Sequence, residues 1–377
     1  MQLDLTDDQV LFQETTARFI EAELPVARTR ALHDDPRGYD RMWLEKSAEL
    51  GWYAMLVPED YGGGSVSAAG LLDAAIVAEA LGRHLQPGPF IPMNVVASVI
   101  AAEGSAAQKA ELLPGLAAGQ VVATWAFADA SGGWDRGAGL VAERAGDRVV
   151  LSGRRGFVQD GASADSLLVV ATLDGQPAQL LVPADRAGVT VRPLTSLDLS
   201  RRFADVVFEG VEVSSEAIVT RGDPSLEAAL LPAIVLSCAD TVGAIDALFS
   251  MTVAYSKDRI AFGRPIGSFQ AIKHVLADQA LWLETCKAGA TAAAVAVASG
   301  DEAAGEIVSM VAAYIGDVAN DIAQECLQVH GGIGYTWEHD LHLYLRRVRS
   351  NGAVYGEPTW HRERVCAFHG LGRGGGR

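Results

Sequence analysis

Residues 224–366 form a long run of helical patterns, and this run constrains the fold more than any other part of the sequence. Helices are expected at about 225–257, 267–299, 302–330 and 338–366, with no strand signal between them. Long helices joined by short connections pack as antiparallel neighbours. The sequence therefore predicts a C-terminal four-helix bundle.

Residues 120–218 have a different pattern, in which short β-rich runs alternate with turn signals such as Leu173-Asp-Gly-Gln. These runs are 121–127, 148–151, 166–171, 179–182, 189–193 and 204–213. We expect a compact antiparallel β domain here.

The first part of the chain is again helical in pattern. Thr6 is suited to be an N-cap, with Asp7 and Asp8 in the first turn. Further helices are expected at about 40–51, 67–82, 92–103 and 105–118. The fold class is therefore α+β and multidomain. The expected domains are a helical N-terminal domain (1–118), a middle β domain (119–220), a helical bundle (221–368) and a disordered Gly-rich tail (369–377).

The formal net charge of −17 argues against nucleic acid or an anionic membrane surface as the main partner. An anionic ligand must be met by local positive groups. The most apolar stretches, such as 288–298, are short, so no membrane span is expected. The start shows no signal peptide. Four scattered cysteines have no metal-ligand spacing, which favours reduced thiols in a cytoplasmic protein without a metal site.

Two glycine-containing motifs interrupt the helical C-terminal sequence. The first runs from Arg259 to Gln270 and includes Phe262-Gly263, and the second, sixty-nine positions further on, runs from Gln328 to Tyr335. Glycine costs about 1 kcal/mol relative to alanine inside a helix, so these glycines point to a required backbone shape. A Gly-Gly pair allows another molecule to approach the main chain. Arg259 and Gln270 supply a cation and an amide suited to a diphosphate and a polar ring.

The two motifs together resemble the flavin-binding C-terminal domain of the acyl-CoA dehydrogenases, with its Arg-x-x-Phe-Gly…Gln and Gln-x-x-Gly-Gly-x-Gly-Tyr patterns. The resemblance covers about residues 3–365, and the order helical, β, helical agrees with it. It implies FAD bound between subunits, α,β-desaturation of an acyl-CoA thioester in lipid β-oxidation, and an electron-transfer flavoprotein as acceptor.

The resemblance also implies roles for individual residues at the nucleotide end of FAD. Arg259 matches the arginine that faces the neighbour's diphosphate, and Phe262 and Gln270 line the same cofactor. Gln328 and Gly332 match the contacts to its adenosine part. The alternatives are a surface salt bridge for Arg259 and a plain helix break for the glycine pair.

The flavin end departs from the family pattern. The family's Thr-Glu-Pro-x-x-Gly-Ser-Asp loop is matched by residues 128–135, where Ala128 replaces the threonine and Trp134 replaces the serine near the thioester. The family's Trp-Ile-Thr segment is matched by Phe157-Val158-Gln159. Phe157 can still stack on the flavin, and Gln159 either donates or fills space. Main-chain N–H groups near Phe127 and Ala128 remain able to reach the ring.

The catalytic base of the family is a glutamate before a glycine, and its place here is taken by Tyr355, followed by Gly356. Tyrosine, with an ordinary pKa near 10, is a poor base for removing the Cα proton. Glu357 either substitutes as the base or is a solvent-facing or capping acid. Some relatives place the glutamate on the first bundle helix, where this chain has Ala233. Asp240, on the same helix, is interpreted as structural.

Two interpretations follow. In the first, the chain is the base-lacking subunit of a hetero-oligomer, here a tetramer with a base-carrying homologue, as in actinobacterial acyl-CoA dehydrogenases of sterol breakdown. In the second, it is a self-sufficient homo-oligomer with Glu357 as base. A flavin-dependent oxidase or monooxygenase on the same fold, and a purely structural partner subunit, are the alternatives.

A histidine and a basic cluster in the C-terminal sequence lead to two further expectations. His330 is expected to be a packed core histidine rather than a cofactor contact. The basic cluster Arg346-Arg347-Val-Arg349 is expected on a solvated or intersubunit salt-bridge face, with attraction of a CoA phosphate as the alternative.

Overall fold

The structure is a computed structural model that describes residues 5–134 and 139–371, and it consists of two compact units. The first unit contains Ala75–Gln86, Ile234–Arg377 and Met1–Ala27, within the described limits, and the second contains Arg28–Ala74 and Pro87–Ala233. The expected Gly-rich tail over 369–377 lies, from residue 372 on, outside the described residues.

Six helices precede the sheet. They are α1 (Asp7–Glu23), α2 (Val26–Ala31), α3 (Arg41–Glu49), α4 (Gly70–Arg83), α5 (Phe90–Glu103) and α6 (Ala106–Ala117). The predicted N-cap at Thr6 is confirmed: its hydroxyl accepts from the Gln9 backbone N–H, while the Gln9 side chain accepts from the Thr6 N–H. The helices expected near 40–51, 67–82, 92–103 and 105–118 are also confirmed, within a few residues at each end.

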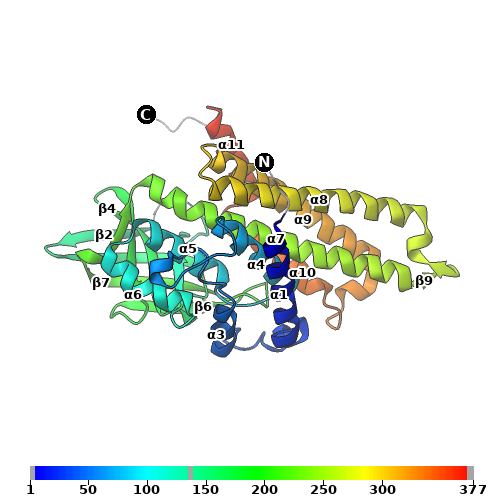
Figure 1. Cartoon of the computed structure of the whole chain (residues 1–377), viewed down its shortest axis with the longest axis horizontal. Coiled ribbons are helices and arrows are strands. Elements are labelled where there is room, and N and C mark those ends of the chain that lie inside the picture. Colours follow the sequence, from blue (N-terminus) through cyan, green and yellow to red (C-terminus); the bar gives the residue numbers. More distant parts are fainter. Residues whose placement is uncertain (1–4, 135–138, 372–377) are drawn as a thin grey trace. The chain divides into compact units, whose positions relative to one another are not determined.

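The middle of the chain forms one sheet in the order β6-β7-β3-β2-β4-β5-β8, with β1 beside β4. Figure 1 labels its strands β2, β4, β6 and β7. The strands are β1 (Ala123–Ala126), β2 (Leu140–Ala145), β3 (Arg148–Gln159), β4 (Ser166–Leu173), β5 (Gln176–Pro183), β6 (Val189–Leu194), β7 (Phe203–Ser214) and β8 (Ile218–Arg221). Most neighbours are antiparallel as predicted, but β1–β4 and β2–β4 pair in parallel. Strands β2 and β8 were not predicted.

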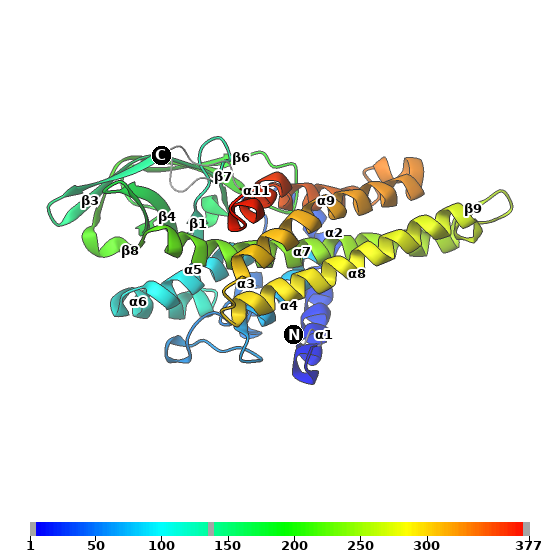
Figure 2. The same cartoon turned by 90° about the horizontal axis from the view of Figure 1, so that it is seen from above.

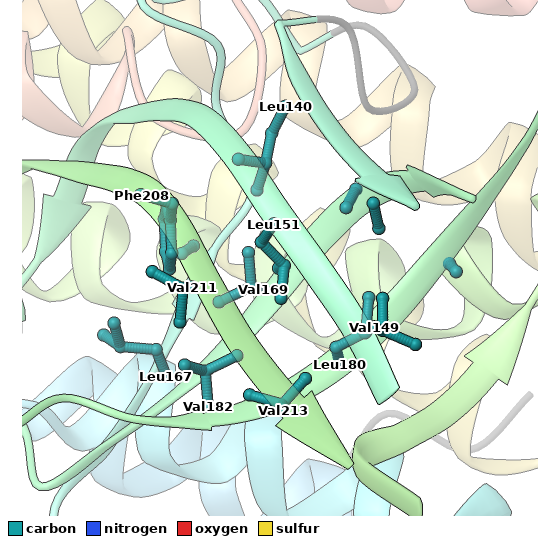
Figure 3. Close-up of a cluster of buried hydrophobic side chains, with 14 of the residues drawn as sticks. Leu140, Val149, Leu151, Leu167, Val169, Leu180, Val182, Phe208, Val211 and Val213 are labelled. Carbon is teal, nitrogen blue, oxygen red and sulfur yellow. The ribbon is translucent and has the colours of Figure 1, made fainter. Parts of the chain in front are cut away.

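The sheet is held by a core of β-branched and leucine side chains. Leu140, Leu151, Leu167 and Val169 have no exposed surface, and Phe208 is 1% exposed. Figure 3 shows these side chains packed together between the strands. Full burial of each such side chain contributes about 1.5–3 kcal/mol. In β2, burial alternates along the first residues, so Leu140 and Ala142 point inward.

The C-terminal helices are α7 (Asp223–Asp258), α8 (Gln270–Ala298), α9 (Ala304–His330), α10 (Leu341–Asn351) and α11 (Pro358–Phe368). The first three agree with the sequence prediction. The single helix expected over 338–366 is wrong, because the chain turns between α10 and α11. Tyr355 and Gly356 there have φ of 63° and 113°, and Pro358 begins the next helix.

A short hairpin, β9 (Ile260–Ala261) and β10 (Arg264–Pro265), joins α7 to α8 and was also not predicted. Figure 2 shows it at the far end of these two helices.

Helix α7 is the most apolar long segment of the described chain, rather than residues 288–298. By length and composition alone it is apolar enough to cross a membrane. However, 89% of its most apolar stretch is buried inside the protein. A core helix accounts for this pattern.

Candidate cofactor and substrate site

The two glycine-containing motifs lie toward one end of the helical bundle. Tyr255, in the last turn of α7, stacks on His330, the last residue of α9, with ring centroids 4.4 Å apart. The Tyr255 hydroxyl donates to the His330 carbonyl oxygen at 3.4 Å. Helices α8, which begins at Gln270, and α9, which ends at His330, run antiparallel, so the start of α8 and the end of α9 lie toward the same end of the bundle (Figure 2). The fold therefore places the two motifs toward the same end of the bundle.

Arg259, Phe262 and Gln270 are all exposed, and Phe262 is 96% exposed. Phe262 has a φ of 53°, which is costly for a side chain of this size and is typical of functional sites. Within the residues that the structure covers, the Arg259 guanidinium makes neither an ion pair nor a hydrogen bond. The surface salt bridge considered for Arg259 is therefore not formed inside this part of the chain.

The adjacent glycines Gly331 and Gly332 have different structural roles. Gly331 ends α9 with a φ of 62°, a conformation that side chains disfavour. Gly332 is exposed, has no positive φ, and a Cβ added to it would meet no atom within 4 Å. The fold of this chain does not require glycine at position 332. Its bare main chain, like that of the neighbouring exposed Gln328, is open to a bound molecule.

His330 is a core residue, as predicted. It is 4% exposed, and its Nδ1 hydrogen donates to the Cys326 carbonyl oxygen at 2.8 Å. Burial lowers the pKa of its imidazole, so it is neutral at physiological pH.

The flavin-end residues belong to the other compact unit. Phe127 and Ala128 are each 3% exposed, and the Phe127 ring lies between Trp125 at 4.6 Å and Trp134 at 5.6 Å. Phe157 is 47% exposed with a φ of 51°, so one aromatic face is accessible. Position 135, the last residue of the matched loop, is outside the described ranges.

Gln159 is buried and its amide is occupied inside the chain. Its Nε2 donates to the Asp160 carboxylate at 3.3 Å, and its Oε1 accepts from Arg201 at 3.3 Å. Of the two roles considered for this side chain, the structure favours filling space over donating to a ligand.

FAD therefore fits the residues matched in the two units unequally. The bundle end offers an exposed guanidinium, exposed amides and open backbone, which suit a diphosphate and an adenosine. The flavin end offers the face of Phe157, but Ala128 has no hydroxyl and the Gln159 amide is already engaged.

The base positions carry no carboxylate. Tyr355 is 5% exposed, and Ala233 on α7 has no exposed surface. Glu357 is exposed and precedes the first residue of α11, but its side chain makes no capping hydrogen bond. This arrangement agrees with a solvent-facing acid at Glu357 rather than the buried carboxylate that the chemistry favours.

The buried ion pair between Arg347 of α10 and Asp240 of α7 was not predicted from the sequence. Arg347 has no exposed surface, and its guanidinium pairs with Asp240 at 2.9 Å. It also donates to the Gln86 carbonyl oxygen at 2.9 Å. The assignment of Arg347 to a solvated basic face is therefore wrong, whereas the structural role for Asp240 is confirmed. The position of Asp240 inside an apolar stretch of α7 was the available signal, because a buried charge needs a partner.

Comparison with known proteins identifies the class. The family model for the acyl-CoA dehydrogenase N-terminal domain matches residues 6–120, and that for the C-terminal domain matches residues 225–367. Together they cover well over half of the chain. The chain belongs to the acyl-CoA dehydrogenase family, whose members are flavin-linked oxidoreductases acting on acyl-CoA.

Among the relatives, acyl-CoA dehydrogenase IpdE2 of Mycolicibacterium smegmatis is 30% identical over 96% of this chain and 99% of its own length. Among solved structures, the ChsE4–ChsE5 complex from Mycobacterium tuberculosis is 25% identical, with a TM-score of 0.89 over 99% of this chain and 100% of the other. A variant of the Tcur3481–Tcur3483 steroid ACAD is 25% identical, with a TM-score of 0.88 over 97% and 98% of the two chains.

Proposed function

We propose that this chain is the base-lacking subunit of a hetero-oligomeric acyl-CoA dehydrogenase, and that it completes the FAD site of a base-carrying neighbour. The main observation behind this proposal is a contrast between the residues matched to a neighbour's cofactor and the position matched to the catalytic base. Arg259, Gln270, Gln328 and Gly332 face outward, available to another subunit's cofactor, while position 355 holds a buried tyrosine. The ChsE4–ChsE5 relative is itself a complex of two different chains, which supports this assembly.

The reaction removes a proton from Cα and a hydride from Cβ of an acyl-CoA thioester. FAD supplies the hydride acceptor when bound. In this proposal Arg259 neutralises diphosphate charge locally, against a chain with a net charge of −17. The proton is taken by a carboxylate of the partner subunit, because tyrosine is too weak a base near neutral pH. An electron-transfer flavoprotein is the proposed final acceptor.

Replacement of Glu357 by Gln separates this proposal from the self-sufficient homo-oligomer. In the complex purified with its partner, we expect Glu357→Gln to leave kcat unchanged. If Glu357 were the base, kcat would fall by about 10²- to 10⁴-fold. Glu363→Gln, at another exposed carboxylate on α11, is the matched control. Steady-state dehydrogenation with an artificial electron acceptor measures both variants.

A further inference from the structure

A small cavity lies inside the first unit, next to the turn between α10 and α11. Its volume is about 30 Å³, which is room for one or two water molecules. Residues from α7, α9, α10, α11 and the turn between α10 and α11 line it, among them Ser237, Thr241, Ala319, Asn351, Gly356 and His361. Most of its lining residues are apolar or glycine, so the few polar side chains among them decide what it can hold.

Asn351, at the end of α10, is one of these side chains. Its side chain is 5% exposed, and its Nδ2 donates to Asp240 Oδ1 at 2.7 Å and to Thr241 Oγ1 at 2.9 Å. The Thr241 hydroxyl hydrogen is already given to the Ser237 carbonyl oxygen at 2.8 Å, so Thr241 can only accept from Asn351. This fixes the orientation of the amide. Asn351 Oδ1 is buried and has no hydrogen-bond partner among the described residues.

His361, in the first turn of α11, is another of these side chains. It is 2% exposed, and its imidazole hydrogen-bonds the Gly356 backbone. Nε2 is the ring nitrogen beside Gly356, 3.0 Å from the point where a Cβ on that glycine would stand. Nε2 therefore carries the hydrogen, and Nδ1 is an acceptor. Within the described part of the chain, Nδ1 is buried and unpaired.

Two residues that line one water-sized cavity thus each carry a buried acceptor without a partner in the described structure, Asn351 Oδ1 and His361 Nδ1. A buried acceptor left without a donor costs about 1–3 kcal/mol. An anion would be repelled by both atoms, and an apolar group would leave both unsatisfied. We propose that this cavity is a binding site for an ordered water molecule that donates one hydrogen to Asn351 Oδ1 and the other to His361 Nδ1.

The water completes a continuous chain of hydrogen bonds. It runs from the Arg347–Asp240 pair through Asn351 and the water to His361, and from His361 to the Gly356 backbone. Gly356 and its neighbour Tyr355 have the positive φ angles that make this turn costly. The bridge therefore acts as a positioning device for the turn at which the family carries its base. It goes beyond the proposed function and does not depend on it.

The first test is a crystal structure of the full chain with its natural partners, at a resolution that shows ordered water. We expect a density peak about 2.7–3.2 Å from both Asn351 Oδ1 and His361 Nδ1. Absence of a peak, a peak that reaches only one atom, or anomalous signal from bromide in the cavity would overturn the proposal. None of these outcomes depends on activity or on which subunit carries the base.

The second test is a double-mutant cycle followed by thermal melting. His361→Gln keeps a donor for Gly356 but removes the acceptor, and Asn351→Leu removes the other acceptor. We expect His361→Gln to lower Tm by on the order of 2 °C in the natural background and clearly less in the Asn351→Leu background. Equal losses in both backgrounds would contradict the bridge.

Two controls accompany this cycle. Thr359→Ala, at an exposed position on α11, should be additive with Asn351→Leu. His361→Asn retains an acceptor near Nδ1 but not the contact with Gly356, so it should remain coupled to Asn351→Leu. Loss of coupling in this variant would also count against the bridge.

Discussion

At the scale of single residues, exposure separates what the chain needs for its own fold from what it offers to other molecules. The backbone at position 331 has a φ of 62°, which favours glycine. At position 332, an added Cβ would meet no described atom within 4 Å, so the fold itself does not demand glycine there. Exposed Phe262 likewise keeps a positive φ without burial to compensate it. Such residues are best explained by a ligand or a partner chain.

Gly332→Ala should therefore weaken FAD binding while leaving the fold intact. We expect about a tenfold loss of affinity, because an added methyl group keeps the cofactor from the main chain. Flavin absorbance of the purified complex and its Tm measure the two effects separately. Gly289→Ala within α8 is the control, expected to raise stability by about 0.5–1 kcal/mol without changing flavin content. Unchanged flavin in Gly332→Ala would contradict the assigned role.

His361 should make stability depend on pH. Burial, and then the Arg364 charge, lower its pKa to about 4 from an ordinary 6.5. The unfolded chain takes up a proton below pH 6.5 that the folded chain does not, so the contribution is full above that pH and is lost towards pH 4. The loss amounts to at most about 3 kcal/mol. The facing thiol of Cys238 has a pKa raised to about 12 and stays neutral throughout.

Chemical unfolding at pH 7 and pH 4.5 checks this prediction. His361→Gln cannot titrate, so its stability should fall less over the same range than that of the natural chain. Parallel curves for the two proteins would show that His361 contributes nothing to the acid sensitivity.

At the scale of elements, α10 is tied to α7 by charge rather than by apolar packing alone. Arg347 contacts Asp240 and the Gln86 carbonyl, and Asn351 contacts Asp240 one turn later. The Tyr344 hydroxyl adds a hydrogen bond to the Arg83 carbonyl oxygen at 2.8 Å. A buried pair of this kind fixes the register of a helix, because any shift leaves a charge unpaired.

Arg347→Met should therefore destabilise the chain by about 3–5 kcal/mol, since it leaves the Asp240 carboxylate buried without its cation. Adding Asp240→Asn should recover part of the loss. Arg349→Met, at an exposed site on the same helix, should change stability by less than about 0.5 kcal/mol. Denaturant unfolding of the natural chain and the three variants measures these differences. A similar effect at positions 347 and 349 would show that the ion pair is unimportant.

At the scale of the whole molecule, the bundle end presents the exposed groups that, in the proposed function, contact the cofactor of another subunit. The exposed Arg259 carries its charge outward in a chain whose overall field repels anions. The flavin end offers fewer groups to a cofactor, because Ala128 has no hydroxyl and the Gln159 amide is hydrogen-bonded inside the chain. An assembly with a homologue that has an intact flavin end and a base would use both halves.

The chain expressed alone should therefore be colourless, and it should gain flavin absorbance only when co-expressed with its base-carrying homologue. Co-purification followed by the ratio of flavin to each chain is the measurement. Arg259→Met in this chain should lower the flavin content of the complex, whereas Arg192→Met, on β6 in the sheet, should not. Yellow, active protein from this chain alone would contradict the subunit proposal.

Local patterns were sufficient for much of this architecture. Apolar periodicity predicted α7, α8 and α9, and the Thr6 cap followed from preferences that act over three residues. The motif at Arg259–Gln270 could be recognised because glycine is unfavourable within helical sequence, which indicates another role for these residues. These features depend on backbone propensity and short-range hydrogen bonds, which the order of residues determines directly.

Contacts between distant residues decided the rest. The sequence predicted Arg347 on the surface, but it is buried in an ion pair with Asp240 of α7. The Gln159 amide could have bound a ligand by sequence alone, but it hydrogen-bonds Asp160 and Arg201. The turn at Tyr355–Gly356 and the cavity beside it exist only because four helices meet there. Burial and electrostatic pairing are properties of neighbours in space, so only the tertiary structure could assign them.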